Sequence, residues 1–429
     1  MWEYFSDKTI LITGGTGFLG TALVCRLVSQ TRPKQIYLLC RGGKDRAIER
    51  WTENLPSSLA QTLTSCPFIT YLDGNIKQPS LGLVNQDPPT HNLTHLIPVL
   101  EIIIHAASSI NLVDPLPKLS PNIIGATERL AHIALACPRL QRFIYISTAY
   151  ANSHLYNTSP TRSPDITIKE TLYPVSSTPA LTTWTQLQTT HTTPEYSPHT
   201  FPWPYAYAKH LSERVFLSIF THSGLEKTHL LIIRPSIFGP AQQLPYRGYS
   251  VPLATPLTAL AAMIAITPSI YFQAATRSRN PDAEVTADEV PVDVVVDRTL
   301  FHIAHGSSGF VHAVCGERGR YRFKDLWEEG MAARRIPWRL RLVWSDLDWH
   351  SPRLHSIARF YVLFGPSFRF GEERTERLWE GMREEERTGS GLVLFKDPGR
   401  GFELVSRRGE MRVCARAFAQ FLGLPKWLL

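Results

Sequence analysis

A tyrosine and a lysine four positions apart, in the segment Tyr205-Ala206-Tyr207-Ala208-Lys209, have the types and spacing of an acid–base pair. On an α-helix such residues lie on the same face, and Pro204 just before them favours a helix start. A free tyrosine has a pKa of about 10 and is a poor acid–base group. An ammonium one turn away favours the phenolate and lowers that pKa. The same pattern also occurs in ordinary amphipathic helices, so it needs support from other positions.

Hydroxyl side chains at the end of an apolar run supply such support. The run Arg142–Ser147 is typical of a buried strand, and Ser147-Thr148-Ala149-Tyr150 marks its end. A hydroxyl at this point can hold a substrate oxygen beside Tyr205. The two segments together predict an acid–base site that acts on a substrate oxygen.

A glycine-rich turn near the start of the chain predicts a dinucleotide site. The apolar run Thr9–Thr13 leads into Thr13-Gly14-Gly15-Thr16-Gly17-Phe18-Leu19-Gly20, and a helical pattern begins near Gly17. Glycines let the backbone approach a pyrophosphate, and the N-terminus of the helix offers unpaired N–H groups. Without a ligand the same glycines would make only a tight turn, but a strand before them and a helix after them favour the cofactor interpretation.

The residues after the second apolar run indicate which dinucleotide is preferred. An NAD site usually has an acid here that binds the ribose 2′-hydroxyl. This chain has Arg41 instead, with Lys44 close by. A guanidinium suits a 2′-phosphate, so we predict NADPH as the cofactor. The alternative is that Arg41 is a solvated loop cation.

Short apolar runs alternate with helical patterns through the first half of the chain. This alternation predicts an α/β fold, a Rossmann doubly wound parallel sheet. We expect a domain over residues 1–310, with embedded substrate-binding segments at about 159–204 and 238–290, and a smaller, mainly helical region over 311–429. The segment Ser159–Pro204 is rich in Thr, Ser and Pro, and we expect it to be irregular, as a substrate-gating lid or a disordered insertion. The runs expected as strands are Thr9–Thr13, Gln35–Cys40, Phe68–Leu72, Ile102–His105, Arg142–Ser147 and His229–Arg234.

The composition and charge of the chain limit the kinds of partner that it can bind. The chain has 429 residues, 43% hydrophobic, and a formal net charge of +8. This charge suits a phosphate-rich cofactor or substrate, or a peripheral contact with an anionic membrane, and it is also compatible with a basic surface that has no partner. No zinc-finger or RNA-binding motif is visible, so we expect no nucleic acid. The six cysteines lack paired spacing, which predicts reduced thiols in an intracellular protein and no metal site. The N-terminus has no basic region followed by an apolar one, so we expect no signal peptide. Prolines interrupt the apolar segment Val251–Phe272, which predicts a buried or interfacial helix that does not span a membrane.

The glycine turn, the hydroxyl after the strand and Tyr-x-x-x-Lys together resemble the extended short-chain dehydrogenase/reductase superfamily. Further motifs along the chain resemble those of the fatty acyl-CoA reductases, also called male-sterility-type NAD-binding proteins. They also resemble those of the thioester reductase domains of carboxylic acid reductases and peptide synthetases. The resemblance runs in order from about Thr9 to Asp297. Besides the glycine turn, it is carried by His105-Ala106-Ala107, Asn122-Ile123-Ile124-Gly125, Ser147-Thr148-Ala149-Tyr150-Ala151-Asn152, Ile168-Lys169-Glu170, Arg234-Pro235-Ser236-Ile237 and Val290-Pro291-Val292-Asp293.

This resemblance implies roles for individual residues. Thr148 would orient the substrate carbonyl, Tyr205 would be the general acid, and Lys209 would tune it while holding the nicotinamide ribose. Asn122 would support the active-site hydrogen-bond network, and Asp293 would cap a helix. The residues implied to line the cofactor are His105, Ala106, Ala107, Pro235, Ser236 and Ile237.

The chain departs from the family after the third predicted strand. The family commonly has Gly-Asp-Ile there, where the acid meets the adenine, and this chain has Gly74-Asn75-Ile76. Since Asn75 can still accept a hydrogen bond, we expect altered affinity for the cofactor with Asn75 and Ile76 still in contact with it. The segment after Pro240 and the C-terminal region follow the family only faintly.

The function implied is NADPH-dependent reduction of an acyl thioester, carried by coenzyme A or a carrier protein, to an aldehyde or a primary alcohol. In that case Val251–Phe272 would form an acyl tunnel, a membrane-facing lid or an ordinary core helix. Two alternatives remain open. One is a ketone reductase or a nucleotide-sugar epimerase or dehydratase of the same superfamily, since the fold hosts all of these. The other is an NADPH-binding scaffold without catalysis, which an intact Thr148, Tyr205 and Lys209 disfavour.

Overall fold

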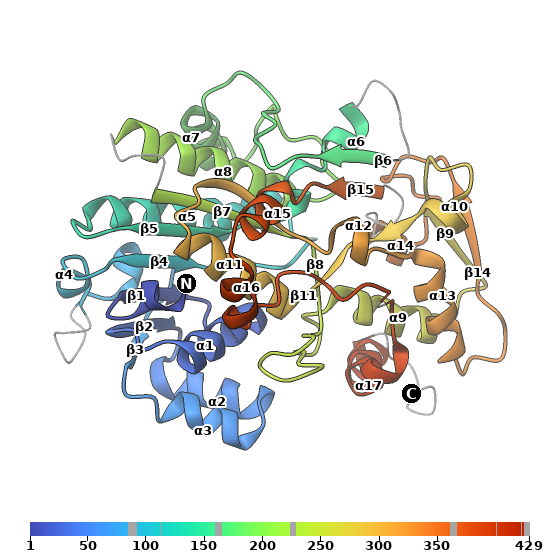
Figure 1. Ribbon diagram of the computed structural model, residues 1–429. Helices are drawn as coiled ribbons and strands as arrows, with labels where there is room; N and C mark the ends of the chain where they lie inside the picture. The colour runs from blue at the N-terminus through green and yellow to red at the C-terminus, as the bar shows by residue number, and fades with distance from the viewer. Residues whose placement is uncertain are drawn as a thin grey trace.

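A seven-stranded sheet forms the centre of the protein (Figure 1). The computed structural model describes residues 1–84, 92–112, 114–158, 165–223, 229–360, 367–399, 401–421 and 423. Each pair of neighbouring strands in this sheet is parallel, in the order β12-β7-β5-β4-β1-β2-β3. The predicted doubly wound α/β sheet is thereby confirmed. Its strands are β1 (Thr9–Thr13), β2 (Gln35–Cys40), β3 (Ile69–Asp73), β4 (Ile102–His105), β5 (Arg142–Ile146), β7 (Leu230–Pro235) and β12 (Gly309–Ala313).

Alternate residues of the strands pack into two separate hydrophobic cores. Leu11 and Phe143 belong to one core, whereas Ile10, Ile12 and Ile144 belong to the other. Successive side chains of a strand point to opposite faces of a sheet. Because both faces are covered here, consecutive residues such as Ile10, Leu11 and Ile12 are all apolar, and this explains the apolar runs in the sequence.

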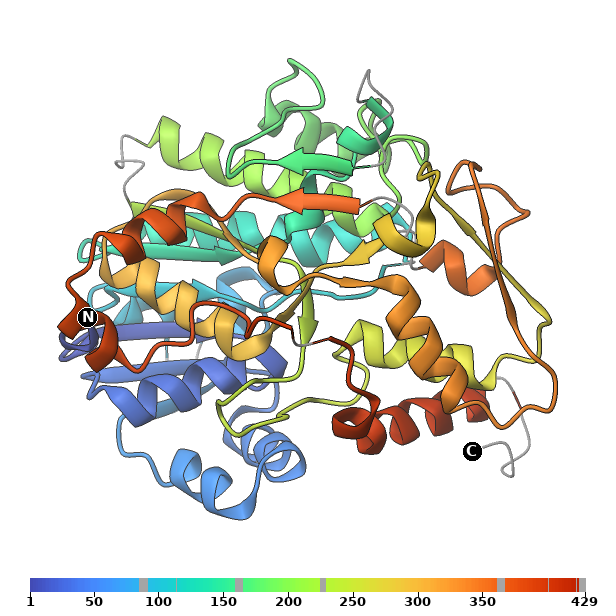
Figure 2. The ribbon, with the colours of Figure 1, turned by 45° about the vertical axis from the view of Figure 1, so that its right-hand side comes forward.

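Helices cover both faces of the sheet (Figures 1 and 2). The core that contains Leu11 is closed by α5 (Leu116–Ala136), α7 (Ala180–Thr190) and α8 (Pro204–His222). The other core is closed by α1 (Phe18–Gln30), α2 (Gly43–Asn54), α3 (Ser57–Thr64) and α11 (Val292–Ala304). The architecture is therefore a three-layer sandwich, with α5 and α8 in contact with each other on one side and α1 and α11 on the other.

The segment expected to be irregular is partly regular in its described residues, 165–204. It contains β6 (Asp165–Ile168) and α7, and α7 packs against α8. Ala180, Trp184 and Leu187 are buried at helical spacing, and Trp184 Nε1 donates a hydrogen bond to Glu128 of α5 at 2.9 Å. Threonine is a weak helix former, so the composition hid an amphipathic helix that tertiary packing stabilises. The expectation of an irregular segment was wrong for this part.

The segment Val251–Phe272 contains α9 (Pro256–Ile266), a buried helix. It packs against α13 (Phe323–Ala332) and α17 (Leu404–Phe421). None of the described helices is long and apolar enough to cross a membrane. The predicted buried helix is confirmed, and its burial between two helices is that of a core element.

Residues after 310 form helices together with short strands in the described part. Strand β12 crosses residue 310, and β14 (Arg341–Ser345) pairs with β9 (Tyr271–Ala275). Backbone hydrogen bonds thus join this part to earlier segments, and the division at residue 310 stays a prediction. The remaining elements are η1 (Trp2–Phe5), η2 (Pro79–Gly82), α4 (Leu93–Leu96), η4 (Ala149–Asn152), α6 (Leu155–Thr158), β8 (Ile237–Gly239), α10 (Pro281–Glu284), β10 (Thr286–Ala287), β11 (Glu289–Pro291), α12 (Gly316–Gly319), β13 (Tyr321–Arg322), α14 (Ser356–Phe360), β15 (Ser367–Phe370), α15 (Glu373–Glu380) and α16 (Glu384–Ser390).

Buried ion pairs connect elements that lie far apart in the chain. Arg26 of α1 donates from Nε and from a terminal nitrogen to the two carboxylate oxygens of Asp297 of α11, both at 2.8 Å. The backbone N–H of Val393 donates to the same carboxylate at 2.7 Å. Arg407 of α17 forms a similar two-bond pair with Glu289 of β11. Each pair leaves a buried charge behind if one partner is removed.

We therefore predict that Asp297→Ala lowers the free energy of unfolding by about 3–5 kcal/mol, because Arg26 would remain buried without its partner. The double variant Arg26→Met/Asp297→Leu should recover most of that loss. Urea unfolding followed by circular dichroism measures both. Arg46→Ala, which breaks the exposed pair with Glu49, is the control and should unfold like the unaltered protein. A loss for Asp297→Ala as small as that of the control would contradict the role given to the pair.

Candidate active site

The turn between β1 and α1 has a backbone that requires glycine. Gly14 has φ +76°, and a Cβ there would lie 2.7 Å from the backbone nitrogen of Ala107. A Cβ on Gly20 would lie 2.0 Å from the carbonyl oxygen of Gly14. The helix begins at Phe18 with Gly17 as its N-cap, and no side chain caps it. Free N–H groups at a helix N-terminus and a close backbone fit a pyrophosphate.

A hydrogen-bond relay fixes the loop after β4 against this turn. Thr13 Oγ1 accepts a hydrogen bond from the N–H of Ala107 at 3.2 Å and lies 2.8 Å from His105 Nδ1. Ala106 N–H donates to the Thr13 carbonyl at 3.2 Å. Burial and the nearby Lys209 lower the pKa of His105 to about 3, so its imidazole is neutral at physiological pH. The predicted cofactor residues of β1 and β4 are thereby brought together.

The turn after β2 presents two exposed cations. Arg41 and Lys44 are exposed and form no ion pair within the described residues. The N–H of Gly42 donates to Asp73 Oδ1 at 2.7 Å. Asp73 is the last residue of β3 and lies opposite Cys40 in the register. We did not predict Asp73, although an acid at the end of a strand beside the cofactor turn was a signal that could have revealed it.

The side chain of Asn75, which was predicted to contact the adenine, forms a hydrogen bond within its own turn. Asn75 Oδ1 accepts a hydrogen bond from the backbone N–H of Lys77 at 3.0 Å, and the Ile76 carbonyl accepts one from Arg129 Nε at 3.0 Å. Asn75 thus shapes the turn after β3 with the oxygen that was expected to face the cofactor. Contacts of Asn75 and Ile76 with a dinucleotide remain a prediction.

The tyrosine and the lysine of the acid–base pair lie on α8, as their spacing predicts. Lys209 is buried, and its Nζ donates to the carbonyl oxygen of Ile146 at the end of β5, at 2.8 Å. The same nitrogen lies 4.7 Å from the ring centroid of Tyr145 and 6.0 Å from that of Tyr205. This contact holds the start of α8 against the carboxyl end of the sheet.

The pKa values of Tyr205 and Lys209 differ from those that the sequence predicted. Burial raises the pKa of Tyr205 above the ordinary tyrosine value, whereas the sequence predicted that Lys209 would lower it. The same burial lowers the pKa of Lys209 to about 7, against the opposing effect of Glu213. Because the ammonium itself loses charge in the protein interior, it cannot offset the desolvation of the phenolate. The Tyr205 hydroxyl therefore stays protonated at neutral pH, as a proton donor requires.

The ends of β5 and β7 are joined by the predicted substrate hydroxyl. Thr148 Oγ1 donates to the carbonyl oxygen of Pro235 at 3.5 Å and accepts from the N–H of Tyr150 at 3.3 Å. The hydroxyls of Ser147 and Ser236 beside it are buried, with no hydrogen-bond partner in the described part of the chain. Buried polar groups without partners call for a ligand or water. The polar groups of a nicotinamide cofactor fit this need.

Asn122 does not contact Tyr205 or Lys209 through any hydrogen bond of the described residues. It lies on α5, and its side-chain nitrogen donates to the carbonyl oxygen of Lys118 in its own helix at 3.0 Å. Ile237, the last predicted cofactor residue, begins β8 and pairs with Glu289 of β11. The roles of Asn122 and Ile237 remain predictions.

The sequence did not lead us to predict a buried ion pair between Glu213 and Arg234, which lies beside Lys209. Glu213 lies one turn beyond Lys209 on α8, and its carboxylate accepts two hydrogen bonds from Arg234, at 2.9 and 2.6 Å. Both side chains are fully buried, and Arg234 also donates to the carbonyl of Thr171 at 2.6 Å. Glu213 raises the pKa of Lys209, so it partly offsets the effect of burial. The spacing of Tyr205, Lys209 and Glu213 along one helix was a signal for it.

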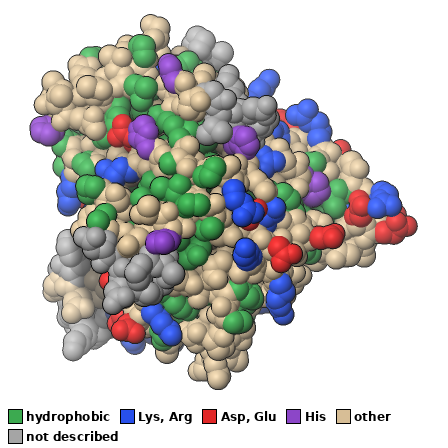
Figure 3. All heavy atoms as spheres, turned by 90° about the vertical axis from the view of Figure 1, so that its left-hand side faces the viewer, with side chains coloured by type: hydrophobic (Ala, Val, Ile, Leu, Met, Phe, Trp, Pro, Cys, Tyr) green, Lys and Arg blue, Asp and Glu red, His purple; other side chains and the backbone are tan. Residues whose placement is uncertain are grey.

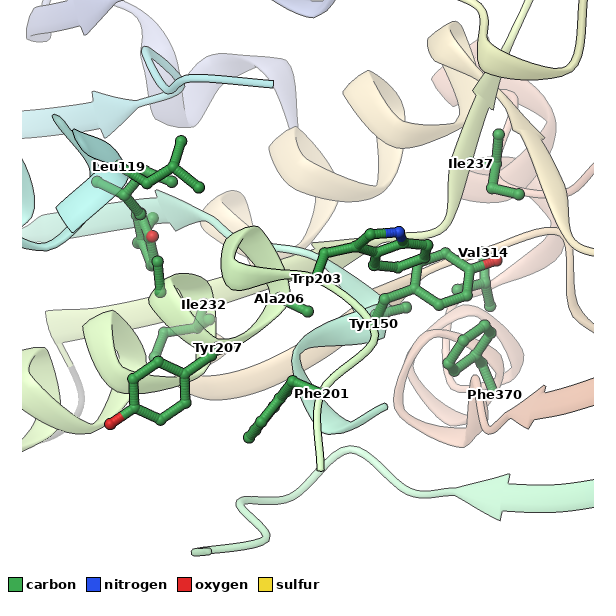
Figure 4. Close-up of a cluster of buried hydrophobic side chains, with 14 of the residues drawn as sticks. Leu119, Tyr150, Phe201, Trp203, Ala206, Tyr207, Ile232, Ile237, Val314 and Phe370 are labelled. Atoms are coloured by element: carbon green, nitrogen blue, oxygen red, sulfur yellow. The ribbon is translucent and has the colours of Figure 1, made fainter. Parts of the chain in front are cut away.

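Hydrophobic side chains lie beside the beginning of α8 (Figure 4). Trp203 lies next to Tyr150, and Val314 and Phe370 lie on the other side of the Tyr150 ring. The rings of Tyr150 and Phe370 are 5.2 Å apart at their centroids. Tyr207 points away from this group, although it follows Tyr205 by only two residues. Apolar side chains therefore lie beside the start of α8, and such surroundings strengthen electrostatic interactions.

Sequence comparisons agree with this arrangement. The sequence model of a family described as "Male sterility protein" matches residues 12–299. Fatty acyl-CoA reductase 1 of Xenopus laevis is 28% identical over 313 residues, which cover 70% of this chain and 55% of that protein. Fatty acyl-CoA reductase 2 of Mus musculus is 29% identical over 309 residues, 69% of this chain and 54% of that protein. The chain thus spans about half the length of the curated relatives it matches.

Solved structures show the same fold. The terminal R domain from the myxalamid PKS-NRPS biosynthetic pathway has a TM-score of 0.60 at 17% identity and covers 98% of this chain and 93% of that chain. The UDP-Glc/GlcNAc 4-epimerase of Campylobacter jejuni has a TM-score of 0.53 at 15% identity, with coverages of 96% and 98%. These likenesses establish an extended short-chain dehydrogenase/reductase fold.

The lowered pKa of Lys209 predicts a pH-dependent effect of Lys209→Met on stability. Between pH about 7 and the usual lysine value, the unfolded chain binds a proton that the folded chain does not, so folding becomes more favourable as the pH rises. Lys209→Met lacks this dependence. Its free energy of unfolding relative to the unaltered protein should be highest below pH 7 and should fall steadily toward pH 10.

Urea unfolding at intervals between pH 6 and pH 10 measures this difference. Lys34→Met, which removes an exposed lysine, is the control and should give a flat difference. A flat difference for Lys209→Met as well would show that the Lys209 ammonium is not desolvated.

Proposed function

Because the chain belongs to the male sterility protein family, we propose that it is an NADPH-dependent oxidoreductase that reduces acyl thioesters. The observation that carries the proposal is the meeting of three groups at the carboxyl edge of the sheet. These are the glycine turn after β1, the Thr148 hydroxyl after β5, and the protonated Tyr205 on α8. A dinucleotide site, an oxygen-binding hydroxyl and a proton donor are the parts that reduction of a carbonyl group needs.

NADPH, when bound, supplies the hydride that adds to the thioester carbonyl carbon. The residues of the chain act on the carbonyl oxygen. Thr148 orients it, and Tyr205 donates its hydroxyl proton to the developing oxyanion, which stabilises the charge in an apolar setting. Lys209, held by Ile146, positions the Tyr205 hydroxyl and holds the nicotinamide ribose. The resulting hemithioacetal collapses to an aldehyde and a free thiol, and a second round of hydride and proton transfer on the same residues gives a primary alcohol.

The acyl thioester substrate is supported by the curated relatives, whose names state reduction of fatty acyl-CoA. The formal net charge of +8 suits a phosphorylated carrier such as coenzyme A or a phosphopantetheine arm. The apolar side chains around Tyr150 and Trp203 suit an acyl chain beside the proton donor. The alternative function, reduction of a ketone or epimerisation of a nucleotide sugar, occurs on the same fold, and the same activity assay distinguishes it.

The preference for NADPH rests on Arg41, which is exposed at the end of β2 and unpaired within the described chain. We predict that Arg41→Ala weakens NADPH binding about 10- to 100-fold and leaves NADH binding almost unchanged, because only NADPH carries the 2′-phosphate. Nucleotide fluorescence titration measures both affinities. Lys34→Ala removes an exposed cation elsewhere and is the control. Equal losses for both nucleotides would contradict a 2′-phosphate contact at Arg41.

We predict that the purified chain oxidises NADPH in the presence of acyl-CoA and releases one free thiol per NADPH if the product is an aldehyde, or one per two NADPH if it is an alcohol. Tyr205→Phe should lower kcat/KM by about 10²–10⁴-fold, because it removes the proton donor. Tyr207→Phe removes a hydroxyl from the same helix that bonds Glu195 instead, and it should retain activity. Absorbance of NADPH and a thiol reagent follow the reaction across acyl chain lengths. Turnover of a ketone or a nucleotide sugar with no turnover of any acyl thioester would refute the proposal.

A further inference from the structure

A small two-stranded sheet exposes apolar and basic side chains together. Strands β9 and β14 are parallel, with Tyr271 opposite Arg341 and Gln273 opposite Val343. Tyr271 and Val343 are exposed, together with Ile270 just before β9 and Trp338 just before β14. These residues and the exposed arginines Arg339 and Arg341 are called the β9–β14 face below.

The alternation of the strands explains why this face is outward. Phe272 is buried and packs against Trp327 of α13, and Trp344 packs against Phe323 of the same helix. Since successive side chains point to opposite sides of a strand, Tyr271 and Val343 must point to solvent. The outward residues are therefore not part of the core, and their apolar character has no role in packing the described chain.

The amount of exposed apolar surface is large for four neighbouring residues. Ile270 is 55% exposed, Tyr271 52%, Trp338 45% and Val343 39%. The Trp338 indole is held in place, because its Nε1 donates to the carbonyl of Pro268 at 3.0 Å. Scattered exposed apolar residues are ordinary, but a group of them at one place marks an interaction surface.

The sequence that leads into β14 is rich in arginine. Residues 334–343 include four arginines and no acid. Arg339 and Arg341 are exposed and form no ion pair within the described residues. The face shown in Figure 3 differs, because there Lys and Arg side chains alternate with Asp and Glu. It lies on the side of the molecule away from β9 and β14.

We propose that the β9–β14 face docks on the surface of an anionic lipid membrane. Tryptophan and tyrosine favour the membrane–water interface, and isoleucine and valine add apolar area that enters the acyl boundary. Arginines beside them attract anionic headgroups. An acidic protein would also attract the arginines, but charge pairing alone gives no reason for exposed Ile270 and Val343. The proposal does not depend on the reaction proposed above, since docking is measured without turnover.

The same sheet lies next to the buried helix α9. The backbone N–H of Arg341 donates to the carbonyl of Ile270 at 2.9 Å, and Arg334 donates to the carbonyl of Thr267 at the end of α9 at 2.6 Å. The proposed membrane contact therefore lies beside the helical part of the chain, away from α2 and α3 at the opposite end of the molecule. Docking in this orientation leaves the exposed turn after β2 in solution.

Flotation of the full chain with vesicles tests this proposal. One set of vesicles is phosphatidylcholine, and the other contains 30% phosphatidylglycerol, each at 0.1 M and 0.5 M NaCl. We expect binding to the anionic vesicles at low salt and weaker binding at high salt, because salt screens the arginines. Arg339→Gln/Arg341→Gln should lower the partition coefficient about thirtyfold. Ile270→Ser/Tyr271→Ser should lower it about tenfold or more, through loss of the apolar contact.

A matched control variant distinguishes the effect of this face on vesicle binding from the effect of net charge. Arg50→Gln/Arg383→Gln removes two exposed arginines elsewhere on the surface and should bind vesicles like the unaltered chain. Circular dichroism melting of every variant identifies any loss of folding, and a variant that does not fold is replaced by Val343→Ser. Equal binding of all variants, or no binding to anionic vesicles at low salt, would overturn the proposal. Capture of an acidic protein through this face without vesicle binding would assign it to a protein partner and would also overturn it.

Discussion

The hydrogen bond from Lys209 Nζ to the carbonyl oxygen of Ile146 connects α8, which carries Tyr205, to the end of β5, two residues before Thr148. A lysine is rarely buried this completely, because its charge is costly in the protein interior. The structure limits that cost with one carbonyl acceptor, two tyrosine rings and the carboxylate of Glu213 one turn away. If the contact were lost, α8 and β5 would no longer hold Tyr205 and Thr148 at the same edge of the sheet.

The rest of the site follows from the parallel sheet. All seven strands end at the same edge, so residues distant in the chain meet there: the glycine turn after β1, His105 at the end of β4, Thr148 after β5 and Pro235 at the end of β7. Ligands bind at this edge in open α/β sheets, at the point where the order of strands reverses. Here that point lies between β1 and β4, where Thr13 bonds to His105 and Ala107.

The parts that could be predicted from the sequence are those with a local signal. The glycine turn, the apolar strands and the spacing of Tyr205 and Lys209 each occupy a few consecutive residues, and the structure has them as expected. The pair Arg26–Asp297 joins residues far apart in the sequence, and no local pattern predicts it. For the pair Arg234–Glu213, the position of Glu213 one turn beyond Lys209 was a local signal, but its partner lies on another element. The pKa of Tyr205 could not be predicted either, because it depends on burial by the whole surrounding structure. Helix α7 was missed since its threonines weaken a pattern that packing against α8 completes.

The central claim is that hydride transfer at a thioester carbonyl takes place beside Tyr205. The most direct test uses NADPH deuterated at C4 on the transferred face, long-chain acyl-CoA and mass spectrometry of the products. The account predicts one deuterium on C1 of each aldehyde, or two on C1 of each alcohol, and labelled product that forms at least about 10²-fold more slowly with Tyr205→Phe. Products without deuterium, or labelled product formed equally well by Tyr205→Phe, would contradict it.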